Sequence, residues 1–169
     1  MNTNIKNILN KINDESFQKK FNLNSYRIYH MKYVADLCKY FCEIFDIPED
    51  TTDIIIIAAL IHDTYKKIDG DNHSKLISDR YEEVFHNELN LTESEKKLLK
   101  DLLLYHTYKD TLIYEGEYKK EVMILGISDN TSKKSRFFEK FKNFNYCDNP
   151  DIIKKKICKK KRILKKSFK

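Results

Sequence analysis

The chain has 169 residues, of which 34% are charged and 41% hydrophobic, with only three Gly and two Pro. This length favours one domain with a real core, and the shortage of turn residues excludes a protein built from many short strands. The sequence shows no run long enough for a membrane span and no apolar core of a secretory signal, so we expect a cytoplasmic protein without a membrane partner.

The net charge of +6 is unevenly distributed along the chain. Residues 151–169 contain ten Lys or Arg and one acid, a local charge of +9, so residues 1–150 carry the remaining −3. We therefore predict a body over 1–150 and a basic C-terminal helix or tail over 151–169. Such a tail could bind nucleic acid or another polyanion, or it could be a last amphipathic helix whose lysines are simply solvated.

Hydrophobic residues recur at helical spacing along most of the body. The spacing predicts a first amphipathic helix over 4–21 and a second from Ser25 to the residues before Pro48, because proline disfavours the helix before it. The apolar run 54–61 follows two threonines suited to a helix N-cap. Its isoleucines have strand propensity, but the run exceeds ordinary strand length, so we expect a helix here as well.

Turn and capping signals divide the second half of the body. The turn Asp69–Asn72 precedes a helix predicted over 73–85. The capping box Thr92–Glu95 predicts a helix that ends near His106, and a further helix is expected over 118–135. The sequence thus predicts an all-α fold, a single compact bundle of about six to eight helices.

His62 and Asp63 lie together at the end of the apolar run, and an imidazole beside a carboxylate makes a compact N/O site for a divalent metal. Other potential ligands are spread along the chain: His30, His73, His86, His106 and Asp129. A hydrogen bond could explain any single buried histidine. However, burying polar groups in several apolar stretches is tolerated chiefly when they are paired or metal-bound, and coordination explains them together.

This order of residues resembles the signature of the HD-domain superfamily of metal-dependent phosphohydrolases. The matching segments are Arg27-x-x-His30, then Ala58 to Lys66 around the doublet, then Ile124 to Asp129. The resemblance extends over about 26–129 and implies an HD-type helical domain within residues 1–150. It implies that a first divalent ion is held by the following side chains: His30, His62, Asp63 and Asp129.

One branch of this superfamily holds two ions by means of two further histidines, which His73 and His106 resemble. His86 competes with His73 for the first of these places, and we favour His73 because His86 falls late in a helix before polar residues. The segments His62–Lys66 and His106-Thr107 are similar to bacterial HD hydrolases that split dinucleoside tetraphosphates symmetrically.

The resemblance implies a hydrolase that carries one or two divalent ions, iron or manganese by the type of ligand. Asp63 would bridge two ions, which would lower the pKa of bound water and neutralise charge on the phosphoryl group. Asp63 and Lys66 are the predicted catalytic residues. Lys66 lies one turn beyond the doublet and could reach a substrate phosphate, or it could be an ordinary surface lysine. Arg27 and Thr107 are further predicted substrate contacts, although Arg27 could instead orient Asp63 or Asp129.

The expected substrate is a nucleotide, first a dinucleoside polyphosphate and second a nucleoside 5′-monophosphate. Ser128 before the last aspartate, and Thr64 and Tyr65 after the doublet, depart from the family pattern and leave the substrate open. Two other functions stay in view. One is an HD nuclease that grips nucleic acid with Lys154–Lys169, and the other is a non-catalytic module that binds a nucleotide without cleaving it.

Overall fold

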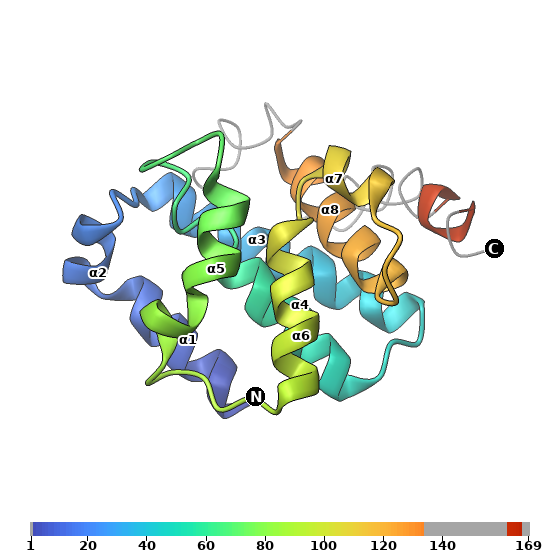
Figure 1. Ribbon diagram of the computed structural model, residues 1–169, viewed down its shortest axis with the longest axis horizontal. Coiled ribbons are helices and arrows are strands. Elements are labelled where there is room, and N and C mark those ends of the chain that lie inside the picture. Colours follow the sequence, from blue (N-terminus) through green and yellow to red (C-terminus); the bar gives the residue numbers. More distant parts are fainter. Residues whose placement is uncertain (1, 134–161, 167–169) are drawn as a thin grey trace, which may run out of the picture.

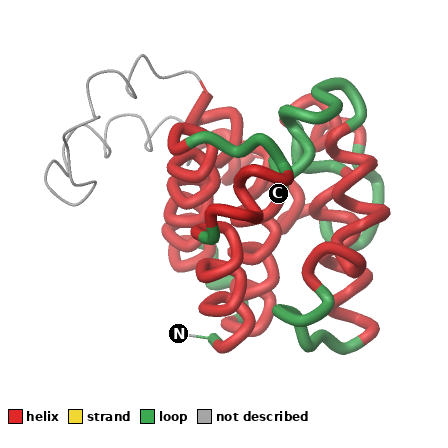
Figure 2. Tube along the Cα trace, turned by 90° about the vertical axis from the view of Figure 1, so that its left-hand side faces the viewer, coloured by secondary structure: helices red, strands yellow, loops and turns green. Residues whose placement is uncertain are grey.

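The computed structural model describes residues 2–133 and 162–166, and this part of the chain contains helices and loops but no strand (Figure 2). The helices are α1 (Thr3–Asn13), α2 (Glu15–Lys20), α3 (Ser25–Ile44), α4 (Glu49–Ile61), α5 (His73–Phe85), α6 (Glu93–Leu104), α7 (Tyr108–Ile113) and α8 (Lys119–Lys133). Residues 162–166 form a further helical turn. The all-α fold predicted from the sequence is confirmed.

Helix α4 occupies the middle of the bundle and contacts α1, α3, α6 and α8 (Figure 1). It contains the isoleucine run, and all residues from Ile54 to Ile61 except the half-buried Ile56 are buried. A helix that is apolar nearly all round belongs in the interior of a protein. Tertiary burial therefore outweighs the strand propensity of the isoleucines, and the helix predicted for this run is confirmed. The predicted N-cap at the threonines is wrong, because α4 begins at Glu49 directly after Pro48.

The single helix predicted over 4–21 is wrong, because the chain changes direction at Asp14. This residue has extended backbone (φ −70°, ψ 129°) and ends α1, while its side chain accepts a hydrogen bond from the backbone N–H of Phe17 and caps α2. Aspartate is among the preferred N-cap residues. The break lets Phe17 and Phe21 turn into the core, where both are buried.

Helix α7 was not predicted, and it packs against α8 through a close contact. Thr107 caps α7 by accepting a hydrogen bond from Asp110 N–H. Thr111 is buried, and its Oγ1 lies within hydrogen-bond distance of the carbonyls of Tyr105 (3.0 Å) and Thr107 (2.9 Å). Its side chain fills the space over Gly126, where a Cβ would overlap it. A residue without a side chain at position 126 therefore allows α7 to lie close against α8.

The C-terminal basic segment is described only over 162–166. Leu164 is fully buried and belongs to the hydrophobic core, whereas Arg162, Lys165 and Lys166 are exposed. This short turn thus packs on the body with its charges in solvent. The predicted boundary at residue 150 and the last two residues of the helix predicted over 118–135 lie outside the described residues.

Among the described helices, none combines the length and the apolar character needed to cross a membrane.

The contact between α7 and α8 makes Gly126 sensitive to substitution. Gly126→Ala would place a methyl group against Thr111, and overpacking of this kind costs about 1–3 kcal/mol. That exceeds the ~1 kcal/mol gained when alanine replaces glycine within a helix. Because the added Cβ would overlap Thr111 Oγ1 itself, the overpacking cost lies near the upper end of its range, and we expect the free energy of unfolding, measured with urea, to fall by about 2 kcal/mol.

Gly70→Ala is the matched control for this substitution. Gly70 does not have a positive φ, and the nearest atom to an added Cβ would be the carbonyl oxygen of Lys66 at 3.6 Å, an ordinary contact. We expect this variant to stay within about 0.5 kcal/mol of wild type. Equal stability of the two variants would contradict the packing argument.

Candidate metal centre

The six side chains predicted as metal ligands lie together in the interior of the bundle. His30 comes from α3, His62 and Asp63 follow the end of α4, His73 begins α5, His106 follows α6, and Asp129 lies on α8. Each of the six is at most 3% exposed. The bundle therefore brings residues that are far apart in sequence into one buried cluster.

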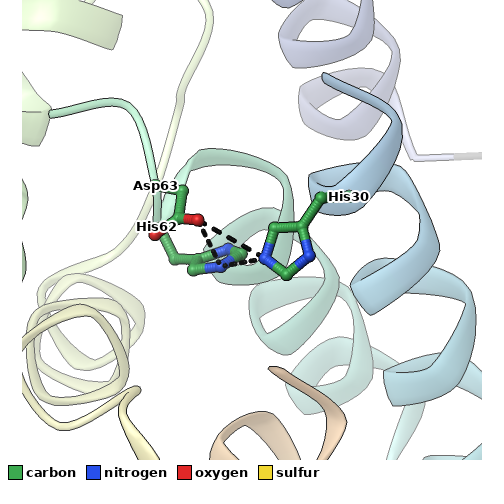
Figure 3. Close-up of side chains that lie close together, drawn as sticks. All are labelled: His30, His62 and Asp63. Carbon is green, nitrogen blue, oxygen red and sulfur yellow. Dashed lines mark hydrogen bonds and ion pairs between the residues drawn. The ribbon is translucent and has the colours of Figure 1, made fainter. Parts of the chain in front are cut away.

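Three of these side chains form a tight triangle, in which His30, His62 and Asp63 point toward one another (Figure 3). The two histidine Nε2 atoms are 3.3 Å apart, and Asp63 Oδ2 lies 3.4 Å from His30 Nε2 and 3.6 Å from His62 Nε2. The point equidistant from three atoms with these separations lies about 2.0 Å from each, which matches a metal–ligand bond to nitrogen or oxygen. The spacing therefore suits a divalent ion.

Asp129 faces the same two histidines from α8. Its Oδ1 lies 3.2 Å from His30 Nε2 and 3.6 Å from His62 Nε2. Asp129 therefore adds a carboxylate oxygen beside His30 and His62, and together with His62 and His106 it forms a further group of possible ligands.

A second group of possible ligands adjoins the first and shares Asp63 with it. His73 Nε2 lies 3.0 Å from His106 Nε2 and 3.4 Å from Asp63 Oδ1. The two oxygens of Asp63 therefore face different histidines, Oδ2 toward His30 and His62 and Oδ1 toward His73. This is the arrangement that a carboxylate bridging two ions requires.

Hydrogen bonds at Nδ1 orient all four imidazoles. In three of them Nδ1 donates to the backbone carbonyl three residues earlier, at 2.7 Å for His62, 2.8 Å for His73 and 2.7 Å for His106. Such a bond places the ring proton on Nδ1 and leaves the Nε2 lone pair for a metal, as the second shell of metal sites commonly does.

Ser132 on α8 performs the same task for His30. Its hydroxyl donates to the carbonyl of Asp129 at 2.8 Å, so its oxygen can accept the proton of His30 Nδ1 at 2.9 Å. The sequence analysis missed Ser132. Its position one turn after Asp129 on a predicted helix was a signal, because residues three apart share a helix face.

Burial and neighbouring charges set the protonation of the centre. Burial lowers the pKa of His106 to about 3, and burial likewise lowers the pKa of His73, so both imidazoles are neutral at neutral pH. Burial would also lower the pKa of His30, but the carboxylates of Asp129 and Asp63 outweigh it and raise that pKa. A metal ion at His30 would therefore compete with a proton.

Asp63 is ionised despite its complete burial. Burial raises the pKa of its carboxyl, but His62, His30 and Arg27 together outweigh burial and hold that pKa well below its usual range. Among the described residues, Asp63 Oδ1 has no hydrogen-bond donor. A buried anionic oxygen without a donor is costly in free energy, and a cation beside it would remove that cost. The donor set thus fits a divalent metal.

The other predicted site residues lie around this cluster. Lys66 is half-buried, and its Nζ donates to the carbonyl of Gly70 at 3.1 Å and lies 3.4 Å from His73 Nδ1. The Thr107 hydroxyl donates to Asp110 at 2.5 Å. The roles of Lys66 and Thr107 toward a substrate stay predictions.

His86 and Arg27 take different places relative to the cluster. His86 is exposed at the end of α5 and takes no part in the cluster, so the structure brings His73 and not His86 to Asp63. Arg27 contacts Asp63 Oδ2 through Nη1, which is one of the two arrangements considered for it from the sequence.

An open cavity of about 720 Å³ adjoins the cluster at His73. Its polar lining includes three lysines and two aspartates: Lys66, Lys75, Lys109, Asp71 and Asp110. Tyr105 and Tyr108 add aromatic surface. A cavity of this size can accommodate a small organic ligand.

The positions of His73 and His86 yield a direct test of the second ligand group. His73→Asn should lower the number of Mn²⁺ ions bound per chain, because it removes one imidazole from the group that Asp63 shares. His86→Asn, the matched control, should leave the stoichiometry unchanged. Elemental analysis of both variants after equilibration with Mn²⁺ measures this, and equal metal content in the two would contradict the assignment of His73.

The pKa of His106 predicts acid lability of the protein in the presence of a chelator. The unfolded chain binds the His106 proton near pH 6.5, while the folded chain binds it only near pH 3. Stability from this group is therefore complete above pH 6.5 and is lost as the pH falls toward 3, by up to about 1.4 kcal/mol per pH unit. Urea unfolding between pH 7 and 4.5 should show a shallower loss for His106→Asn than for wild type. An identical slope in the two proteins would refute the prediction.

Comparison with known proteins agrees with this geometry. The sequence pattern of the HD domain family matches residues 27–134, well over half of the chain. All six clustered residues fall within the matched segment. No curated protein and no solved structure matches the chain. The match over residues 27–134 shows that the chain belongs to the HD domain family.

Proposed function

We propose that this protein is a metal-dependent phosphohydrolase that cleaves a phosphate ester or anhydride of a nucleotide, with a dinucleoside polyphosphate as the leading substrate. One observation carries the proposal. Four imidazole Nε2 atoms and two carboxylates converge in a buried cluster, and an open cavity with lysines in its lining begins at His73. A buried cluster of possible metal ligands beside a partly cationic cavity supports hydrolysis of a phosphate compound.

The residues of the cluster would hold one ion between His30, His62, Asp63 and Asp129 and a second beside Asp63, His73 and His106. Such an ion supplies Lewis-acid activation of water and of the phosphoryl group. Nitrogen and oxygen ligands without a thiolate suit iron or manganese. Asp63 would fix the spacing between the two positions through its two oxygens.

The lining of the cavity supports an anionic substrate. Lys66 lies at the edge of the cavity nearest His73 and is the lysine best placed to bind a phosphate next to the ions. Lys109 is exposed on α7 and could bind a more distant phosphate. Tyr105 offers an aromatic surface on which a nucleobase could stack. A chain of phosphates with nucleosides at its ends would match this arrangement, with phosphates at Lys66 and Lys109 and a nucleobase at Tyr105.

The proposal predicts metal-dependent turnover that requires Asp63. Wild type loaded with Mn²⁺ or Fe²⁺ should release mononucleotides from a dinucleoside tetraphosphate, and Asp63→Ala should lose activity by roughly 10²–10³-fold or more, as is usual when a group that stabilises the transition state is removed. Chromatography of the products measures this. His86→Asn should retain the wild-type rate.

Other outcomes of the same assay would replace the proposal. Release of phosphate from nucleoside 5′-monophosphates alone would identify a monophosphatase. Tight nucleotide binding by the metal-loaded protein without any product would identify a binding module.

A further inference from the structure

Arg27 contacts an oxygen atom that belongs to the first group of possible metal ligands. It lies on α3 one turn before His30, and its Nη1 contacts Asp63 Oδ2. The same oxygen lies 3.4 Å from His30 Nε2 and 3.6 Å from His62 Nε2. A guanidinium therefore lies at the oxygen that a metal ion in the first position would need.

The guanidinium is only partly held by the protein. Its side chain is 14% exposed, and among the described residues Nε is buried without a hydrogen-bond partner. The ring of Tyr26, which is 48% exposed, lies 6.0 Å from Arg27 Cζ. Arg27 thus stands at the margin of the centre, between a buried carboxylate and solvent, with donors still available for another acceptor.

Two cations compete electrostatically when they approach one carboxylate oxygen. An ion bound at Asp63 Oδ2 would weaken the attraction of Arg27 to that oxygen and would repel the guanidinium itself. A phosphate bound to the same ion would present oxygens to a planar fork of N–H donors that suits them. The guanidinium released from Asp63 would then have a stronger hydrogen-bond partner, the phosphate, next to Asp63.

We propose that Arg27 is a phosphate-binding residue that Asp63 holds in the metal-free protein: with a divalent ion at Asp63, the guanidinium of Arg27 would leave Oδ2 and bind the substrate phosphate. This inference rests on the proposed function. It differs from a purely structural role, in which a permanent salt bridge from Arg27 positions Asp63 for the ion. The two roles predict opposite effects on metal affinity.

The first measurement is a calorimetric titration of the metal-free protein with Mn²⁺. Arg27→Gln keeps a hydrogen-bond donor for Asp63 but removes the competing charge, so we expect its Mn²⁺ affinity to rise roughly fivefold to tenfold. Arg27→Lys keeps the charge and should stay within about threefold of wild type. Arg80→Gln removes an exposed arginine from α5 and is the control, with no change expected. A lower Mn²⁺ affinity of Arg27→Gln would overturn the proposal and establish the structural role.

The second measurement is the binding of inorganic phosphate to the Mn²⁺-loaded proteins. Arg27→Gln should bind phosphate at least roughly tenfold more weakly than wild type, the scale expected when a charged hydrogen-bond donor is lost. Unchanged phosphate affinity would overturn the proposed transfer of Arg27 from Asp63 to the substrate phosphate.

The two readouts separate this inference from the proposed function. A wild type that binds no Mn²⁺ would refute both. A wild type that binds Mn²⁺ but shows weaker metal binding in Arg27→Gln would refute the inference alone. Should Arg27→Gln fail to fold, as judged by circular dichroism, Arg27→Lys decides: it should keep its metal affinity and bind phosphate roughly tenfold more weakly, and wild-type phosphate affinity would overturn the proposal.

Discussion

The buried carboxylate of Asp63 is the constraint on which the rest of the centre depends. It is fully buried and ionised, and an isolated carboxylate in a protein interior is very costly in free energy. The surrounding helices lower this cost by bringing Arg27 and His30 from α3 and His62 from the end of α4 to Oδ2. Oδ1 faces His73 and among the described residues has no donor, so the compensation within the protein is incomplete on that side.

The apolar character of α4 explains how such a carboxylate comes to be buried. Helix α4 is surrounded by α1, α3, α6 and α8, and the His62–Asp63 doublet, which follows directly on its last residue, is fully buried. The loop to α5 then returns His73 to the same point. Core packing therefore fixes the metal centre, because the same isoleucines that make α4 central also deliver the doublet to the interior.

The sequence allowed the all-α fold and the central helix to be predicted, because helical periodicity and caps are local signals. His30 and Asp129 could be selected because each interrupts an apolar pattern, and His73 could be preferred over His86 because His86 falls late in a predicted helix before polar residues. The break at Asp14, the close fit of Thr111 on Gly126 and the oxygen chosen by Arg27 were not predicted. Each of these depends on which surfaces meet in three dimensions, and local spacing does not contain that information.

The formal charge of the cluster connects the binding of metal ions with the binding of an anionic substrate. With the imidazoles neutral, as metal binding requires, the carboxylates of Asp63 and Asp129 and the guanidinium of Arg27 give the centre one negative charge. One divalent ion would make the centre +1, and two would make it +3. Such an excess of positive charge in a buried site is unfavourable without an anion, and a phosphate group bound at the ions supplies one. The same excess would drive Arg27 from Asp63 toward that phosphate, so metal loading and substrate binding would stabilise each other.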